Sequence, residues 1–176
     1  MLGRMQPSKL AEWNALSADA AAEDILPCCG SRVWASAMAS HRPLHTQEAL
    51  TLTASETWLG LSETDWHEAF ASHPRIGQRQ APTHASHQSA AWSAQEQSQV
   101  GTSDGAAKLA EANRLYEKRF GHIFLICANG LSATTILAAL QARLDHDPAT
   151  ELRIAAEEQR RITHLRLQRW LTQGER

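Results

Sequence analysis

Apolar residues recur every three to four positions along most of the chain, which is the spacing of helices that bury one face. Alanine, leucine, glutamate, glutamine and arginine are abundant, and these residues favour helices. The sequence therefore predicts an all-α fold of about seven to nine helices. They are expected near residues 8–15, 18–27, 31–40, 46–60, 63–72, 93–101, 105–120, 131–144 and 148–172.

Two segments break the helical pattern. The stretch "GQRQAPTHASHQSAAW", residues 77–92, is polar and without period, and we expect a long loop there. Loops of this length in compact domains are often functional. The stretch "HIFLICA", residues 122–128, is apolar but has no second strand to pair with, so we expect an extended, buried link between two helices.

Length and composition predict one compact domain, 1–176, because 43% of its 176 residues are hydrophobic. The 17 basic and 19 acidic residues leave a net charge of −2 without a long run of either sign, so neither nucleic acid nor a membrane surface is an expected partner. No stretch resembles a signal peptide or a membrane span. Three cysteines without a disulfide or CxxC pattern fit a reducing cytoplasm.

Sequence signatures of metals and nucleotides are weak or absent. In "DWHEAFASH" the two histidines, His67 and His73, are six residues apart, whereas the HExxH motif places them four apart on one helix face. In "DHD", residues 145–147, Asp147 precedes Pro148, and a helix start with aspartate as N-cap explains the pattern better than metal ligation. GxSxG, GxGxxG and P-loop motifs do not occur. Cys127 lies in an apolar run and is expected in the core.

His73 stands directly before Pro74, which disfavours the helical conformation for the residue that precedes it. The helix is therefore expected to end here, with the imidazole at a corner between helix and loop. A histidine with an ordinary pKa near 6.5 is a natural proton carrier. The alternative is that His73 only caps a helix-end carbonyl, and the sequence alone leaves both open.

Glu96 and Arg166 are the other two candidates. Ser93 followed three residues later by Glu96 predicts a capping box, which would place a carboxylate at the positive end of a helix. Arg166 lies on an apolar helix face between Ile162 and Trp170, where a guanidinium is costly unless it is paired. Either an internal carboxylate or an anionic ligand could pair with it, and a bidentate fork suits both.

The chain resembles the family of 2-oxo-4-hydroxy-4-carboxy-5-ureidoimidazoline (OHCU) decarboxylases of the ureide pathway over most of its length. The resemblance is carried by six ordered blocks: "LPCCGSRVWASAM" (26–38), "ASHPRIG" (71–77), "SAQEQ" (93–97), "YEKRFGHIFLICANG" (116–130), "ILAALQARLDHDPATEL" (136–152) and "ITHLRL" (162–167). Several blocks in order are more specific than any single motif. The loop residues 78–91 and His122 depart from the family pattern.

This resemblance implies an all-α homodimer that needs no cofactor and converts OHCU to S-allantoin in urate degradation. It places the catalytic histidine at His73, a substrate contact at Pro74, a paired glutamate and glutamine at Glu96 and Gln97, and the carboxylate-binding arginine at Arg166. The rest of the pocket would be lined by Ser93, Phe124, Leu125, Ile126, Cys127 and Ala128.

Two other classes of protein remain as alternatives. A helical interaction module would expose its tryptophans, but most of them lie in apolar stripes, and only Trp92, at the end of the predicted loop, is a candidate for exposure. A metal-dependent hydrolase is suggested by nothing more than the nine histidines.

Overall fold

The computed structural model describes residues 8–78, 86–98 and 106–173, and within these ranges it contains nine helices and no strand. The prediction of an all-α fold is confirmed. The helices are α1 (Lys9–Ala15), α2 (Ala18–Cys29), α3 (Arg32–Ser40), α4 (Gln47–Leu59), α5 (Glu63–Ala71), α6 (His87–Glu96), α7 (Ala106–Phe120), α8 (Ala133–Arg143) and α9 (Pro148–Thr172). All except α6 lie within two residues of a predicted helix at each end.

Capping side chains explain where the helices begin. Every helix except α7, whose start borders residues outside the described part, follows a serine, threonine or aspartate whose side-chain oxygen accepts an amide hydrogen of the first turn. Asp147 performs this role for α9, with Pro148 in the first turn, as predicted. The metal reading of residues 145–147 is therefore unnecessary.

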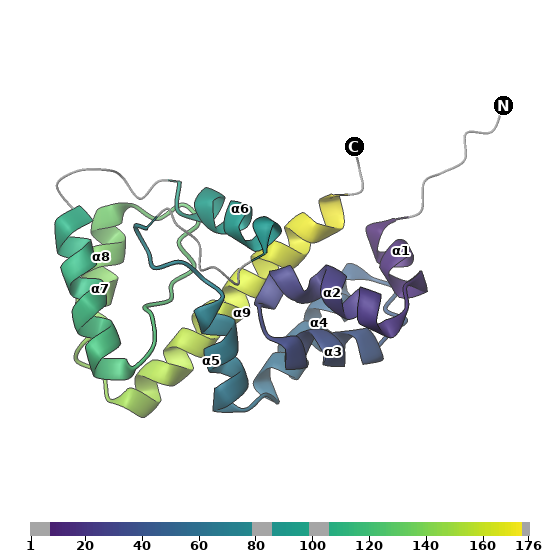
Figure 1. Cartoon of the computed structure of the whole chain (residues 1–176), viewed down its shortest axis with the longest axis horizontal. Helices are drawn as coiled ribbons and strands as arrows, with labels where there is room; N and C mark the ends of the chain where they lie inside the picture. Colours follow the sequence, from purple (N-terminus) through teal and green to yellow (C-terminus); the bar gives the residue numbers. More distant parts are fainter. Residues whose placement is uncertain (1–7, 79–85, 99–105, 174–176) are drawn as a thin grey trace.

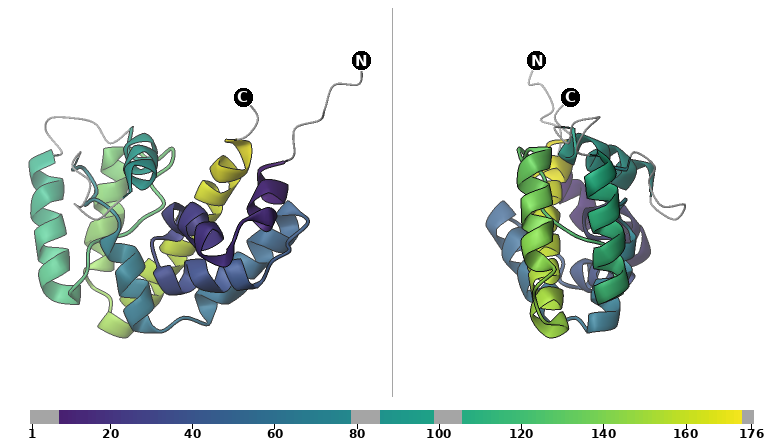
Figure 2. Two further views of the ribbon diagram at one scale, coloured as in Figure 1. Left: turned by 45° about the vertical axis from the view of Figure 1, so that its right-hand side comes forward. Right: turned by 90° about the vertical axis from the view of Figure 1, so that its left-hand side faces the viewer.

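The long helix α9 connects two groups of helices. Figures 1 and 2 show α1 to α4 gathered around its C-terminal half, with α7 and α8 side by side near its N-terminal end and α5 and α6 between. Helix α2 packs on both α3 and α9. None of the described helices is both long and apolar enough to cross a membrane.

Buried tryptophans join the helices of the larger group. Trp13, Trp34 and Trp58 are at most 2% exposed, and each indole N–H donates to a backbone carbonyl of another helix. Buried indoles need such a partner, so each ring fixes the distance between two helices. Trp92 is also buried, at 5% exposure. The expectation that it is exposed is wrong, because α6 packs against α2 with Trp92 in the core.

Helix α6 begins six residues earlier than predicted. Its N-cap is Ser86, which accepts from the Ser89 amide, so residues 87–92 are helical and do not belong to a loop. Residues 79–85 of the predicted loop lie outside the described residues. Ser93 therefore occupies the interior of α6 and not its start, and the predicted capping box of Ser93 and Glu96 is wrong.

The extended link 122–128 is held by side chains, as no strand in the described ranges pairs with it. Arg143 of α8 donates to the Leu125 carbonyl at 2.8 Å, and Glu158 of α9 accepts the Cys127 amide at 2.8 Å. Residues 123–128 belong to neither a helix nor a strand, and most of them are buried or half-buried, as expected for a link between two helices. These two backbone groups already have partners within the protein.

Glu151 of α9 is the centre of the network that positions Arg143. The fully buried carboxylate accepts from Arg143 Nε at 2.8 Å, from His146 Nδ1 at 2.8 Å and from the Tyr116 hydroxyl. Burial raises the pKa of Glu151, but the hydrogen bonds from Arg143, Tyr116 and His146 outweigh it and lower the pKa overall. The carboxylate is therefore ionised and fixes Arg143 against the link.

Replacing Glu151 by glutamine is expected to lower the free energy of unfolding by about 3–5 kcal/mol, because the Arg143 charge loses its buried partner. Urea denaturation followed by circular dichroism measures the change. The matched control is Glu157→Gln, which removes a partly exposed pair with Arg160 and should cost no more than about 1 kcal/mol. If both substitutions lowered the free energy of unfolding by the same small amount, Glu151 would not be the residue that fixes Arg143 against the link.

Candidate functional site

His73 lies just beyond the C-terminus of α5, and only 6% of the residue is exposed. The last residue of α5 is Ala71, and the His73 amide still donates to the Phe70 carbonyl at 3.1 Å. Pro74 follows, where the chain has left the helix. The prediction that the helix ends at this proline is confirmed.

The end of α5 packs closely against the end of α2. Gly30, in the left-handed conformation with φ of 88°, terminates α2, and a Cβ atom at this position would lie 2.6 Å from Ser72 Cβ. Any larger residue would therefore push the two helix ends apart. This close approach brings the residue before His73 against the last turn of α2, whose carbonyls have no helical partners.

Two side chains of α9 supply the missing partners. Arg166 Nη1 donates to the Pro27 carbonyl at 3.2 Å, and Gln159 Nε2 donates to the Cys29 carbonyl at 3.1 Å. Gln159, Thr163 and Arg166 are spaced four and three residues apart, so they share one helix face. All three are at most 3% exposed. Helix α9 thus carries a buried polar stripe toward α2 and His73.

Arg166 is fully buried, and an internal carboxylate pairs with it. Its Nε and Nη2 donate to the two oxygens of Glu96, each at 3.0 Å. Nη1 also donates to Ser89 Oγ at 3.1 Å and Nη2 to Ser93 Oγ at 2.9 Å. The longest contact is from Nη2 to His73 Nδ1, at 3.5 Å. Of the two partners that the sequence left open for Arg166, the structure shows the internal one.

Glu96 is the last residue of α6, so it lies at the negative end of the helix dipole and not at the positive end as predicted. Two arginines compensate for this placement. Glu96 Oε1 accepts from Arg169 Nη1 at 3.0 Å in addition to its pair with Arg166. One carboxylate therefore faces two guanidinium groups, and the cluster carries one excess positive charge.

A small pocket lies beside this cluster, with a volume of about 20 Å³. It is large enough for about one water molecule. Nine of its eleven lining residues are site residues that the family resemblance implies, and Ile76 and Ile162 are the two additional ones. The pocket is lined by His73, Pro74, Ile76, Ser93, Glu96, Gln97, Phe124, Leu125, Ile126, Ala128 and Ile162, of which Ile76 lies within the predicted block "ASHPRIG".

Cys127 is the one predicted lining residue that does not border this pocket. Its amide donates to Glu158, and burial raises the pKa of its half-buried thiol. Its contact with a substrate therefore stays a prediction. Arg166 does not border the pocket either, but its Nη2 contacts three residues that do: His73, Ser93 and Glu96.

The surroundings of His73 favour a neutral imidazole. Burial lowers its pKa well below 6.5, the Arg166 charge lowers it further, and a contact with the Gln159 side chain acts in the opposite direction. A guanidinium group has no acceptor, so Nδ1 must offer its lone pair toward Arg166. In a neutral ring the proton is then on Nε2. His73 is thus a base rather than a cation at neutral pH.

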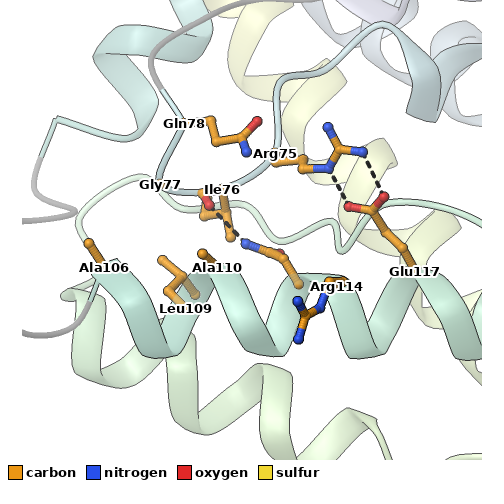
Figure 3. A pocket seen from close by; sticks show the side chains of 10 residues that line it. Arg75, Ile76, Gly77, Gln78, Ala106, Leu109, Ala110, Arg114 and Glu117 are labelled. Atoms are coloured by element: carbon orange, nitrogen blue, oxygen red, sulfur yellow. Dashed lines mark hydrogen bonds and ion pairs between the residues drawn. The ribbon is translucent and has the colours of Figure 1, made fainter.

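A second, larger pocket of about 290 Å³ lies between α7 and the segment that follows His73. Figure 3 shows Arg75 paired with Glu117 across it, while Asn113 donates to the Ile76 carbonyl at 3.0 Å. Gly77 lies close to α7, because a Cβ there would approach Leu109 to 2.9 Å. These contacts hold the segment after His73 on α7. Of the predicted site residues, none borders this second pocket.

Sequence reasoning missed Arg169, Ser89 and Gln159. Arg169 and Gln159 are ordinary polar residues within a helix, and only their spacing from Arg166, three and seven residues, could have indicated that they share its face. Ser89 fell in the predicted loop. Among the described residues, no three histidine, cysteine, aspartate or glutamate side chains gather as ligands for a metal ion.

Comparisons with known proteins show the family of this chain. The family whose sequence profile matches residues 14–168 is described as OHCU decarboxylase. The uric acid degradation bifunctional protein TTL of Arabidopsis thaliana is 41% identical over 143 residues, which cover 80% of this chain and 44% of that protein. A 2-oxo-4-hydroxy-4-carboxy-5-ureidoimidazoline decarboxylase of Haloferax volcanii is 29% identical over 73% of this chain and 74% of its own length.

Solved structures show the same fold. An OHCU decarboxylase crystallised in the presence of (S)-allantoin superposes with a TM-score of 0.72 and 37% identity, covering 85% of this chain and 98% of that one. An (S)-allantoin synthase superposes with a TM-score of 0.70 at 18% identity, over 94% of this chain and 54% of that one, and supports the fold alone. The family profile spans most of the chain, and the chain belongs to the OHCU decarboxylase family.

Proposed function

We propose that the protein decarboxylates OHCU to S-allantoin without a cofactor. The observation that carries this proposal is the buried, neutral His73 beside the Arg166 and Glu96 pair, in a pocket lined by the residues that the family resemblance predicts. The homologous structure crystallised in the presence of (S)-allantoin supports it. The chain spans 44% of the bifunctional Arabidopsis relative, so the activity proposed is that of the decarboxylase portion.

OHCU carries its own electron sink, which is why protein side chains suffice. The bond between the carboxylate and the ring carbon breaks, and carbon dioxide leaves. The electron pair forms a ring double bond as the neighbouring imine nitrogen takes up a proton. Loss of the hydroxyl proton and protonation of the adjacent carbon then give allantoin. The protein must therefore bind an acid, accept a hydroxyl proton and deliver a proton to one face of the ring.

His73 is proposed to accept the hydroxyl proton at Nδ1. The 3.5 Å contact between this atom and Arg166 Nη2 is the loosest in the cluster, so a substrate oxygen can replace it most easily. Arg166 Nη2 would then hold the substrate carboxylate, and the excess positive charge contributed by Arg169 favours an anion here. Glu96 keeps Arg166 in place through their ion pair. The carboxylate of Glu96 also forms part of the pocket wall.

Substrate entry requires the pocket to widen. At about 20 Å³ it holds roughly one water molecule, whereas OHCU has a ring, a carboxylate and a ureido arm. Pro74, Gln97 and residues 124–128 would contact the ring and the ureido arm once the pocket has widened. Gln97 is held beside the segment that follows His73, because its Oε1 accepts the Gly77 amide at 2.9 Å.

The assembly and location of the protein are proposed on the same resemblance. We expect a homodimer in the cytoplasm, with the small molecule OHCU as its partner and residues 1–176 as one domain. The described thiols, Cys28, Cys29 and Cys127, are free, which is compatible with a reducing compartment. The buried position of Trp92 weighs against the alternative of an interaction module with exposed tryptophans.

The substitution His73→Gln is expected to lower kcat for freshly generated OHCU by about 10²- to 10⁴-fold, the usual contribution of a general base. Chiral detection of allantoin follows the reaction, and circular dichroism checks the fold. His87→Gln, an exposed histidine of α6, is the control and should retain full activity. Full turnover by folded His73→Gln protein would refute the assignment.

The dependence of kcat/KM on pH is expected to reflect the lowered pKa of His73. Because the pKa lies well below 6.5, the imidazole stays neutral while the pH falls from about 7.5 through 6.5, and activity should stay constant over this range. Activity should decline only at lower pH, where His73 gains a proton and ceases to be a base. A decline centred at or above 6.5 would contradict this assignment.

Arg166→Lys is expected to lower kcat/KM by roughly 10- to 100-fold, because one ammonium group cannot replace the bidentate fork to Glu96 and also bind a substrate acid. The comparison is Arg160→Lys on the same helix, whose pair with Glu157 is partly exposed. That variant should behave as the parent. Steady-state kinetics at saturating OHCU give kcat, and at limiting OHCU they give kcat/KM. An unchanged kcat/KM in Arg166→Lys would exclude a role of Arg166 in substrate binding.

A further inference from the structure

The side-chain amide of Gln159 has one orientation that satisfies its neighbours. The Cys29 carbonyl can only accept a hydrogen bond, so the group 3.1 Å from it must be the NH₂ of Gln159. The same nitrogen donates to Thr163 Oγ1 at 3.2 Å, while the Thr163 hydroxyl donates to the main-chain carbonyl of Gln159 at 3.0 Å. The Gln159 Oε1 atom is therefore held on the opposite side of the amide, away from α2.

Two buried polar atoms of this cluster lack a hydrogen-bond partner. Neither Gln159 Oε1 nor His73 Nε2 has a hydrogen-bond partner among the described residues, although both are buried. An unpaired buried polar atom costs about 1–3 kcal/mol. One is an acceptor, and the other carries the ring proton, because Nδ1 faces the donor Arg166. Gln159 contacts the ring closely enough to influence its titration.

We propose that Gln159 is a positioning residue for His73: its Oε1 holds the Nε2–H side of the ring, so that Nδ1 is directed to the substrate. This inference rests on the proposed function for its catalytic part. When His73 takes a proton at Nδ1, the ring becomes a cation, and an amide oxygen on Nε2–H stabilises that cation. Histidine bases are commonly oriented by a third group of this kind.

The other groups around His73 do not offer this stabilisation. Arg166 of α9 is a cation and opposes a charged imidazole. The carboxylate of Glu96, from α6, is occupied by two arginines. The thiols of Cys28 and Cys29, from α2, are buried, which raises the pKa of both, that of Cys29 to about 12, so they stay neutral. Of these neighbours, Gln159 is the one with an unpaired acceptor oxygen.

The test compares Gln159→Leu, which removes the acceptor, with Gln159→Glu, which retains an oxygen and adds charge. The leucine variant should lose about 10- to 100-fold in kcat with KM changed by less than about 3-fold. The glutamate variant should retain more activity, and the acid limb of its pH profile should move to higher pH. His164→Gln, on the same helix but bonded to Ser55, is the control and should match the parent.

A merely structural role for Gln159 would lower the melting temperature of both variants without moving the acid limb. That result, or full kcat in Gln159→Leu, would overturn the proposal. ¹⁵N NMR of the histidine ring without substrate gives a second readout, which does not depend on catalysis. The parent should show one tautomer of His73, with a proton on Nε2, and Gln159→Leu a mixture of two. An unchanged ring spectrum would overturn the positioning role even if OHCU were not the substrate.

Discussion

The site depends on one buried ion pair, between Arg166 and Glu96. Arg166 is fully buried on the polar stripe of α9, and such a charge is tolerated only with full pairing. The pair spans 70 residues of sequence and binds the end of α6 to the C-terminal half of α9. The remaining donors of the guanidinium reach the end of α2 and His73. Three helices and the candidate base are thus positioned by a single side chain.

Helix ends supply most of the site. His73 follows the end of α5, Glu96 ends α6, and the carbonyls of Pro27 and Cys29 lie in the last turn of α2. These ends expose unpaired backbone groups and tolerate irregular chain, whereas the interior of a helix does neither. Helix α9 passes all three: Gln159 and Arg166 donate to carbonyls at the end of α2, and Arg166 also contacts the side chains of Glu96 and His73. The extended link 124–128 closes the other side, held by Arg143 and Glu158.

Much of this could be predicted from local sequence. Helical periodicity and capping residues located eight of the nine described helices, and Pro74 and Asp147 fixed two boundaries that the structure confirms. The sequence also predicted that Arg166 has a negatively charged partner, because a guanidinium on an apolar helix face is costly unless it is paired. Helix α6 was misplaced because two serines, Ser86 and Ser93, are both acceptable N-caps, and only packing against α2 and α9 selects the first.

The remaining features follow from long-range pairing, which one sequence does not reveal. Nothing local indicates that Arg166 reaches Glu96, that Arg169 joins it, or that Gln159 donates to the Cys29 carbonyl at the end of α2. The extended link is another case: its conformation was predictable from its composition, but the backbone partners of Leu125 and Cys127 come from helices that follow it in the chain. The identity of the pocket-lining residues rested on resemblance to a family, and the structure brings nearly all of them together.

The central claim is that the Arg166 and Glu96 pair holds His73 as a neutral base with its proton on Nε2. Long-range ¹H–¹⁵N correlation spectra of the histidine rings at pH 7 test this directly, with His73 assigned by comparison with His73→Gln protein. The account predicts an unprotonated Nδ1 and a protonated Nε2. A doubly protonated ring, or a ring with its proton on Nδ1, would contradict it.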